Sequence, residues 1–365
     1  MKRITPADSR IQYMGRIDRS DPEAPAFIWA GSLVQFAFTG SVLRLAVENH
    51  VCYNGLQIGY VLDGKEFQLQ LAKDSVPHDY EIPVSGDGVH RFTLFKRQDS
   101  THWYRLRGIE IAGELRELPP LPSYRIECFG DSVTAGSVVE AVGHVGASDP
   151  PVYDSVYDNA WHSYAMQLAR LLPAQVHLTA QGGIALFDNT GYFDNGRYGM
   201  ETAYDKLWYL PYVPMQEWDF SRYQPDLVIM AIGQNDAHRG STDGILTGAE
   251  REAWLSRYCA MLSDLAEKYP QAEFLLTLTI LMHDGDWEEL LDEACERIGS
   301  PRVKRFRFTR TGKATPGHPR IPEQCEMACE LAEYIRNKYH MQQLRIMRKG
   351  DHANEQNISR SGKRD

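Results

Sequence analysis

The sequence lacks any long apolar run and any excess of positive charge. Its 365 residues are 43% apolar and 24% charged, and the formal net charge is −10. No stretch approaches the roughly 20 consecutive apolar residues that a membrane-spanning helix needs. An acidic chain without a basic, aromatic-interleaved patch also matches poorly with nucleic acid or an anionic membrane surface. We therefore expect neither a nucleic acid nor a membrane as a partner.

A disulfide framework and a secretory leader are missing as well. The six cysteines are scattered through the chain, and the first residues, MKRITPADSRIQYMG, are polar with no apolar core. A signal peptide would need an apolar segment there. Scattered cysteines in a large chain of this kind are more often reduced than bridged. These absences predict a cytoplasmic protein with free thiols.

The first third of the chain consists of short alternating runs divided by turn residues. Examples are SLVQFAF, SVLRLAVEN and VHRFTLFKR, and Asp63-Gly64 is typical of a hairpin turn. Strands at this spacing, without helical periodicity, predict a β-sandwich (jelly roll) over residues 1–116. The proline-rich residues 117–123 predict a stiff linker after it.

After the linker, strands and helices alternate through residues 124–346. The candidate strands are 125–129, 175–180, 226–232, 273–281 and 303–308, and the candidate helices are 158–172, 248–268, 287–298 and 322–339. The runs DLVIMAI and EFLLTLTIL are nearly continuous in apolar residues, as in strands buried on both faces. This alternation predicts a three-layer α/β/α domain with a parallel sheet. The polar residues 347–365 predict a disordered tail.

Four short motifs fall at the predicted ends of these elements. Gly130-Asp131-Ser132 follows the first strand, Gly182 the second, and Gly233-Gln234-Asn235-Asp236 the third, while His318 precedes the last helix. Each alone could be an ordinary turn, loop or helix cap. Because the carboxyl ends of parallel strands meet at one edge of a sheet, their order favours a common site. A serine there can act as a nucleophile, a histidine as its base, and nearby N–H groups as an oxyanion hole.

Together the four motifs resemble the sequence blocks of the SGNH (GDSL-type) hydrolase superfamily. The earlier segment YMGRIDRSDPEAPAFIWAGSLVQFAFTGSVLRLAVEN resembles the start of the jelly-roll domain in carbohydrate esterase family 2. This resemblance implies an enzyme that removes acetyl groups from polysaccharides or their oligosaccharides, without a metal or an organic cofactor. It implies Ser132 as the nucleophile and His318 as the general base. It also implies an oxyanion hole made of the Ser132 N–H, the Gly182 N–H and the Asn235 side chain.

One residue usual in the superfamily is absent. The aspartate expected three residues before the histidine is Thr315 here. Some family 2 esterases work with a Ser-His dyad in which a backbone carbonyl orients the imidazole, and we expect such a dyad. A carbonyl can hold the required tautomer, but it stabilises an imidazolium less than a carboxylate does. Asp284 and Asp286 are alternative carboxylates for this role.

Two other functions stay open at this point. A lipid esterase or thioesterase would use the same catalytic residues but would need a long apolar groove, whereas residues 182–223 are polar and aromatic. A carbohydrate-binding protein on an inactive scaffold would share the fold. Aromatic residues of the first module could then form its sugar-binding surface, although packing is their commoner role; they include Trp29, Tyr53, Tyr60 and Trp103. With no leader in view, small imported acetylated oligosaccharides fit better as substrates than a cell-wall polymer.

Overall fold

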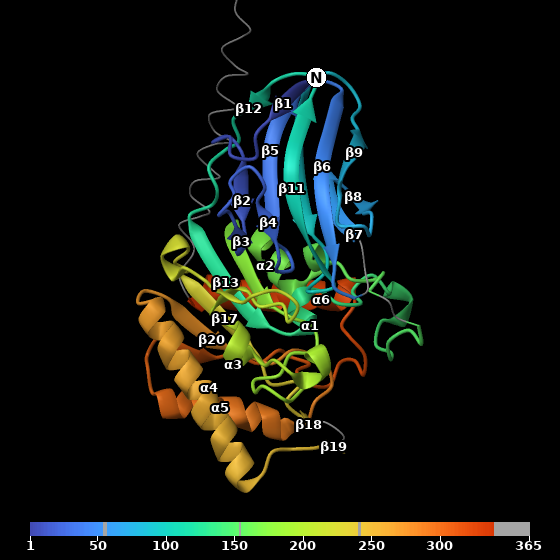
Figure 1. Cartoon of the computed structure of the whole chain (residues 1–365). Helices are drawn as coiled ribbons and strands as arrows, with labels where there is room; N and C mark the ends of the chain where they lie inside the picture. Colours follow the sequence, from blue (N-terminus) through green and yellow to red (C-terminus); the bar gives the residue numbers. More distant parts are fainter. Residues whose placement is uncertain (54–56, 153–154, 240–241, 339–365) are drawn as a thin grey trace, which may run out of the picture.

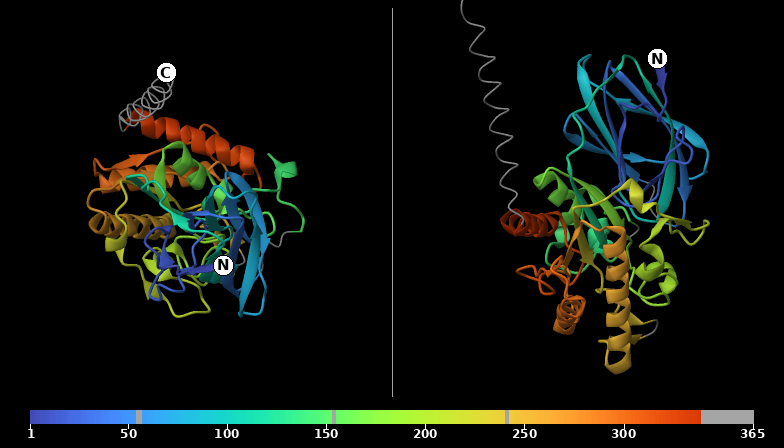
Figure 2. Two further views of the ribbon diagram at one scale, coloured as in Figure 1. Left: turned by 90° about the horizontal axis from the view of Figure 1, so that it is seen from above. Right: turned by 90° about the vertical axis from the view of Figure 1, so that its left-hand side faces the viewer.

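The computed structural model describes residues 1–53, 57–152, 155–239 and 242–338. It contains a β-sandwich followed by an α/β domain, and the N-terminus lies at the end of the sandwich remote from the α/β domain (Figures 1 and 2). The predicted tail, residues 347–365, lies outside the described residues. All six cysteines are free thiols. No helix in the described part of the chain has the length and apolar character needed to cross a membrane.

The first module is formed by twelve short or medium strands. These are β1 (Lys2–Ile4), β2 (Gln12–Met14), β3 (Ile17–Asp18), β4 (Ala26–Phe27), β5 (Leu33–Thr39), β6 (Val42–Val51), β7 (Gln57–Leu62), β8 (Lys65–Gln70), β9 (Pro77–Pro83), β10 (Val89–Lys96), β11 (His102–Ile111) and β12 (Leu115–Arg116). They form two antiparallel sheets, β3-β4-β11-β6-β9 and β12-β5-β10-β7-β8; β1 joins the first sheet at β11 and β2 the second at β5.

The pairing of these strands is that of a jelly roll. β4 pairs with β11, β5 with β10, β6 with β9 and β7 with β8, so the first strand of the set pairs with the last and the pairs nest inward. Alternate side chains, such as Val34, Phe36 and Phe38 of β5, are buried between the sheets. The sandwich predicted from the alternating runs is confirmed.

The second module is built on a parallel five-stranded sheet. Its order is β14 (Ala174–Ala180), β13 (Tyr124–Gly130), β17 (Leu227–Ala231), β20 (Glu273–Leu276) and β21 (Val303–Arg305). Its helices are α1 (Ser132–Ala135), α2 (Tyr164–Leu171), α3 (Met200–Ala203), α4 (Gly248–Lys268), α5 (Gly285–Ile298) and α6 (Ile321–Lys338). Short 3₁₀ turns (η1 Val142–His144, η2 Ala160–His162, η3 Phe193–Gly196, η4 Phe220–Arg222) and small strands (β15 Lys206–Trp208, β16 Gln216–Glu217, β18 His238–Arg239, β19 Thr242–Asp243) lie in its loops.

The alternation of buried side chains along the strands makes this module three-layered. Leu227 and Ile229 of β17 pack in the core that includes α2 and α6, while Val228 and Met230 pack in the core that includes α4 and α5. The figures show the two helix pairs on opposite faces of the sheet (Figures 1 and 2). The predicted α/β/α arrangement is therefore confirmed.

Three predicted elements are shorter than expected: a helix, a strand, and the strand predicted at 303–308, which is β21 and ends at Arg305. The helix predicted at 158–172 begins as η2, and α2 starts only after Ser163, whose hydroxyl accepts the Met166 N–H at 3.3 Å as an N-cap. The strand predicted at 273–281 ends at Leu276. Beyond it the Thr279 N–H donates to the side chain of Gln234 rather than to a neighbouring strand. Thr279 thus contacts the Gly233–Asp236 motif at the edge of the sheet instead of continuing the strand.

A buried ion pair joins the two modules. Arg16, between β2 and β3, and Glu127 of β13 have side chains with no exposed surface, and the Arg16 Nε donates to Glu127 Oε1 at 3.0 Å. Nη1 of Arg16 donates to the carbonyls of Tyr204 and Lys206, at 2.7 and 3.0 Å. The Glu127 carboxylate also accepts the hydroxyls of Thr179 and Tyr269. Because nearly every polar atom of the pair has a partner, the pair can be buried and sets one relative orientation.

We predict that Arg16→Met lowers the free energy of unfolding by about 3–5 kcal/mol, since it leaves the Glu127 carboxylate buried without its cation. Urea denaturation would measure this loss. Arg44→Met is the matched control, because Arg44 pairs with the partly exposed Glu110 at 3.2 Å on the sheet surface and should contribute about 1 kcal/mol or less. Equal losses in the two variants would contradict a special role for the buried pair.

Candidate active site

Ser132 begins helix α1 at the carboxyl end of β13. The Asp131 side chain caps this helix by accepting the Val133 N–H at 3.0 Å. A Cβ at Gly130 would lie 2.0 Å from Thr134 Oγ1, so the tight turn from strand to helix requires glycine. As the first helical residue, Ser132 has a backbone N–H with no intrahelical acceptor. The motif therefore caps a helix and places the Ser132 hydroxyl and the Ser132 backbone N–H at the carboxyl end of β13.

His318 meets Ser132 from the loop between β21 and α6. Its Nε2 lies 2.9 Å from Ser132 Oγ, although the two residues are 186 positions apart in the chain. The predicted pair of Ser132 and His318 is thus brought together. A histidine at this distance can take the hydroxyl proton directly.

A carboxylate completes the site, and it comes from a residue that no motif predicts. Asp149, in the loop between α1 and α2, has its Oδ2 2.6 Å from His318 Nδ1. Its Oδ1 accepts the His318 backbone N–H at 2.9 Å and Nη2 of Arg320 at 2.8 Å. Burial disfavours the charged form of Asp149, but the hydrogen bonds and charge of His318 and the hydrogen bond from Arg320 outweigh it and hold the pKa of Asp149 below the ordinary range. Asp149 is therefore a carboxylate at neutral pH.

The prediction that a backbone carbonyl orients the His318 imidazole is wrong, because the Asp149 carboxylate lies at His318 Nδ1. Neither Asp284 nor Asp286 takes the role, since these residues lie at the N-terminus of α5. Thr315, in the usual position of the aspartate, is buried and donates its hydroxyl to the Gly317 carbonyl at 3.0 Å. One sequence signal for Asp149 exists in retrospect: a Cβ at Gly317 would lie 2.7 Å from the Asp149 backbone nitrogen, so that glycine admits the Asp149 loop.

The third motif ties neighbouring strand ends together. Gln234 donates through Nε2 to Asp131 at 2.7 Å and accepts the Thr279 N–H at 2.9 Å. The Asn235 amide donates one N–H to the Ile184 carbonyl at 3.0 Å. An asparagine amide carries two N–H groups, so Asn235 can donate a second hydrogen bond in addition to this one.

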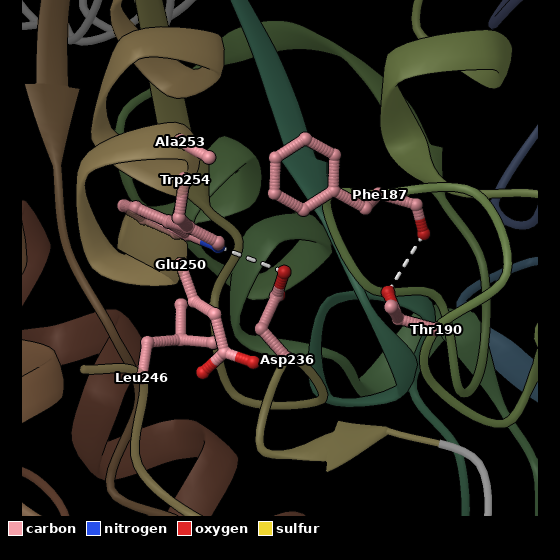
Figure 3. Close-up of a pocket in the computed structure, with 7 residues that line it drawn as sticks. All are labelled: Phe187, Thr190, Asp236, Leu246, Glu250, Ala253 and Trp254. Carbon is pink, nitrogen blue, oxygen red and sulfur yellow. Dashed lines mark hydrogen bonds between the residues drawn. The ribbon is translucent and has the colours of Figure 1, made fainter. Parts of the chain in front are cut away.

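Asp236, the residue after Asn235, is buried. Its carboxyl accepts the Leu186 N–H at 2.9 Å and the Trp254 indole N–H at 2.8 Å, at the edge of a cavity of about 240 Å³ (Figure 3). Burial raises the pKa of Asp236 to about 7, because the hydrogen bonds offset only part of the cost of a buried charge. Among the described residues that line the cavity, none is Ser132, Asn235 or His318, so this cavity supplies no acyl groove to the serine.

At Gly182 the structure shows a contact that the sequence did not predict. Its N–H donates to Asp99 Oδ2 at 2.9 Å, and Asp99 belongs to the β-sandwich. The expected third donor of an oxyanion hole is therefore engaged by a carboxylate of the protein itself. The other two predicted donors, the Ser132 N–H and the Asn235 amide, do not take part in this contact with Asp99.

One group of described side chains has the spacing of a metal site. Glu66, Glu140 and His162 bring their ligand atoms within 4.8 Å of one another, at the contact between the modules. Asn159 Nδ2 donates to both carboxylates at 2.7 Å, and Arg97 pairs with Glu140 at 2.5 Å. Both carboxylates thus have hydrogen-bond partners within the protein, and the cluster links Glu66 of the β-sandwich to the second module.

Comparison with known proteins agrees with this architecture. Residues 13–121 match the family described as carbohydrate esterase 2 N-terminal, and residues 128–300 match the GDSL-like lipase/acylhydrolase family. The chain is 29% identical to the acetylxylan esterase/glucomannan deacetylase of Cellvibrio japonicus, over 91% of this chain and 90% of that protein. It is 28% identical to the cellulase/esterase CelE of Acetivibrio thermocellus over 90% of this chain, and it spans only 39% of that longer protein.

A solved structure matches both modules at once. The family two carbohydrate esterase from Clostridium thermocellum in complex with cellohexaose aligns with a TM-score of 0.73 and 27% identity, covering 91% of this chain and 99% of that one. The fold and the family matches thus make the chain similar to GDSL-like lipase/acylhydrolases that carry an added jelly-roll module. More specifically, the chain has the two-domain architecture of the family 2 carbohydrate esterases.

The raised pKa of Asp236 predicts a pH dependence of stability. The folded protein holds a proton that the unfolded chain, with an ordinary carboxyl pKa of 3.8, releases, so the stability from this proton is full below that value and is lost as the pH rises to about 7. We expect the melting temperature of the parent, relative to Asp236→Asn, to fall over this interval and then level off.

Thermal unfolding of the two proteins from pH 4 to 8 would measure this difference. Asp87→Asn, on an exposed turn of the β-sandwich, is the control. A parent-minus-variant difference that stays constant across the range would show that Asp236 does not titrate as described.

Proposed function

We propose that this chain is a serine esterase that removes O-acetyl groups from carbohydrates, with acetylated oligosaccharides as the substrate class. The observation that carries the proposal is the hydrogen-bonded series from Ser132 Oγ through His318 to Asp149, at 2.9 and 2.6 Å. A hydroxyl, an imidazole and a carboxylate in this order are the parts that acyl transfer needs. The N-terminal module and the names of the similar proteins support the carbohydrate half of the proposal.

The proposed reaction proceeds in two acyl transfers. His318 Nε2 accepts the Ser132 proton as Oγ attacks the acetyl carbonyl, and Asp149 holds the Nδ1–H and stabilises the imidazolium that forms. The Ser132 N–H and the Asn235 amide receive the negative charge of the tetrahedral intermediate. The sugar hydroxyl leaves with the proton from His318. Water then hydrolyses the acetyl-enzyme by the same steps and releases acetate.

Acetate release from acetylated xylo- and manno-oligosaccharides tests the proposal. We expect release by the parent and none by Ser132→Ala, since no other group can form the acyl-enzyme, while circular dichroism shows both proteins folded. Nitrophenyl esters of increasing chain length run alongside. Faster turnover of long acyl chains than of acetate would replace the proposal by a lipid esterase or thioesterase, and sugar binding without turnover would replace it by a binding protein.

For Asp149→Asn we expect a loss of about 10²–10⁴ in kcat with a small change in KM, because an amide cannot stabilise the imidazolium and favours the wrong tautomer. Initial rates with 4-nitrophenyl acetate measure this effect. Asp284→Asn, at the start of α5, is the control and should retain the parent rate. If Asp149→Asn also retained it, a dyad would be sufficient.

A further inference from the structure

Asp99 is a buried carboxylate that the β-sandwich places against the second motif of the hydrolase domain. It follows β10, is 6% exposed, and its Oδ2 accepts the Gly182 N–H at 2.9 Å and Gln181 Nε2 at 2.8 Å. Its Oδ1 accepts the Tyr53 hydroxyl at 2.9 Å and the Thr101 N–H at 3.3 Å. Both oxygens are thus held from two sides, and a carboxylate in this setting does not swing away without losing four hydrogen bonds.

The same contact explains why residue 182 is glycine. A Cβ there would lie 2.6 Å from Asp99 Oδ2, whereas the next side chain, Ser137 Oγ, would be 3.6 Å away. The backbone of Gly182 is not in the left-handed region, so an alanine could adopt its conformation. Glycine is therefore required here by the close approach of Asp99 and by nothing in the local backbone.

The turn that Asp99 holds carries the group that orients Asn235. The Ile184 N–H closes the turn onto the Gln181 carbonyl at 3.3 Å, and the Ile184 carbonyl accepts the Asn235 amide at 3.0 Å. Gln181 Oε1 also accepts the Ser100 N–H at 3.2 Å and the Tyr209 hydroxyl at 2.6 Å. An unbroken series of hydrogen bonds thus runs from the β-sandwich to the Asn235 amide.

We propose that Asp99 is a positioning residue. By accepting the Gly182 N–H it fixes the 181–184 turn, and the Ile184 carbonyl of that turn orients the Asn235 amide towards the oxyanion. The inference rests on the proposed function for the role of Asn235. It gives the β-sandwich a part in catalysis. Misaligned donors lose most of their effect on a transition state, so the turn matters to kcat.

A double-mutant cycle on kcat tests the positioning role. Asp99→Ala should lower kcat for 4-nitrophenyl acetate by about 10-fold or more with KM little changed, within the 10²–10³-fold loss expected for Asn235→Ala. In the Asn235→Ala background the same change should cost less than about 3-fold, because the group it positions is gone. Asp99→Asn, which keeps one acceptor oxygen, should recover part of the loss. Equal costs of Asp99→Ala in both backgrounds would overturn the proposal.

Asp18→Ala is the matched control for this cycle. Asp18 is likewise a buried carboxylate of the β-sandwich, 4% exposed, that accepts a donor of the hydrolase domain, the Trp208 indole N–H at 2.8 Å. It should leave kcat close to that of the parent. A drop as large as that of Asp99→Ala would show that any break between the modules has this effect, and would overturn the specific role of Asp99.

A second double-mutant cycle measures the melting temperature and does not depend on enzyme activity. Gly182→Ala should lower the melting temperature in the parent but little in Asp99→Ala, since the clash it creates is with that carboxylate. Equal drops would overturn the assignment of the Gly182 contact. If the parent shows no Ser132-dependent turnover, the proposed function fails and the positioning role with it, whatever the thermal cycle shows. Ser132-dependent turnover without coupling between Asp99 and Asn235 overturns the positioning role alone.

Discussion

The structure depends on a buried ion pair between Arg16 and Glu127. Both side chains are withdrawn from solvent, which is costly unless the polar atoms are paired, and nearly all of them have partners, drawn from both modules. Glu127 lies in β13, the strand that ends at the serine motif. The ion pair thereby helps to set the relative placement of the modules from within the strand that ends at Gly130, and the loop with Asp99 contacts the 181–184 turn across the same junction.

Three aspartates around the site differ in their electrostatics because their surroundings differ. Asp149 is ionised because the hydrogen bonds and charge of His318 and the hydrogen bond from Arg320 overcome its burial. Burial raises the pKa values of Asp131 and Asp236, although each accepts hydrogen bonds. The carboxylate beside the histidine can thus stabilise an imidazolium, while the two beneath the strand ends serve as acceptors that shape the Gly-Asp-Ser and Asn motifs.

Much of the fold could be predicted because its elements have regular periods. Alternating runs gave the strands of the jelly roll, and the predicted helix at 248–268 has the bounds of α4. The serine and histidine could be predicted from motifs at strand ends and from the resemblance to a superfamily. The strand predicted over 273–281 was too long, because an apolar run shows burial but not where a chain leaves its ladder of hydrogen bonds.

The sequence by itself thus determined the two modules, the parallel sheet and the meeting of Ser132 with His318, since periodicity and strand order place these at one edge. The tertiary structure alone decided what surrounds them. Asp149 reaches His318 across 169 residues and Asp99 reaches Gly182 across 83, each from an irregular loop. An irregular loop has no periodic pattern from which its contacts could be predicted. The sequence features that accompany these two contacts are Gly317 and Gly182, whose lack of a side chain makes room for the carboxylates.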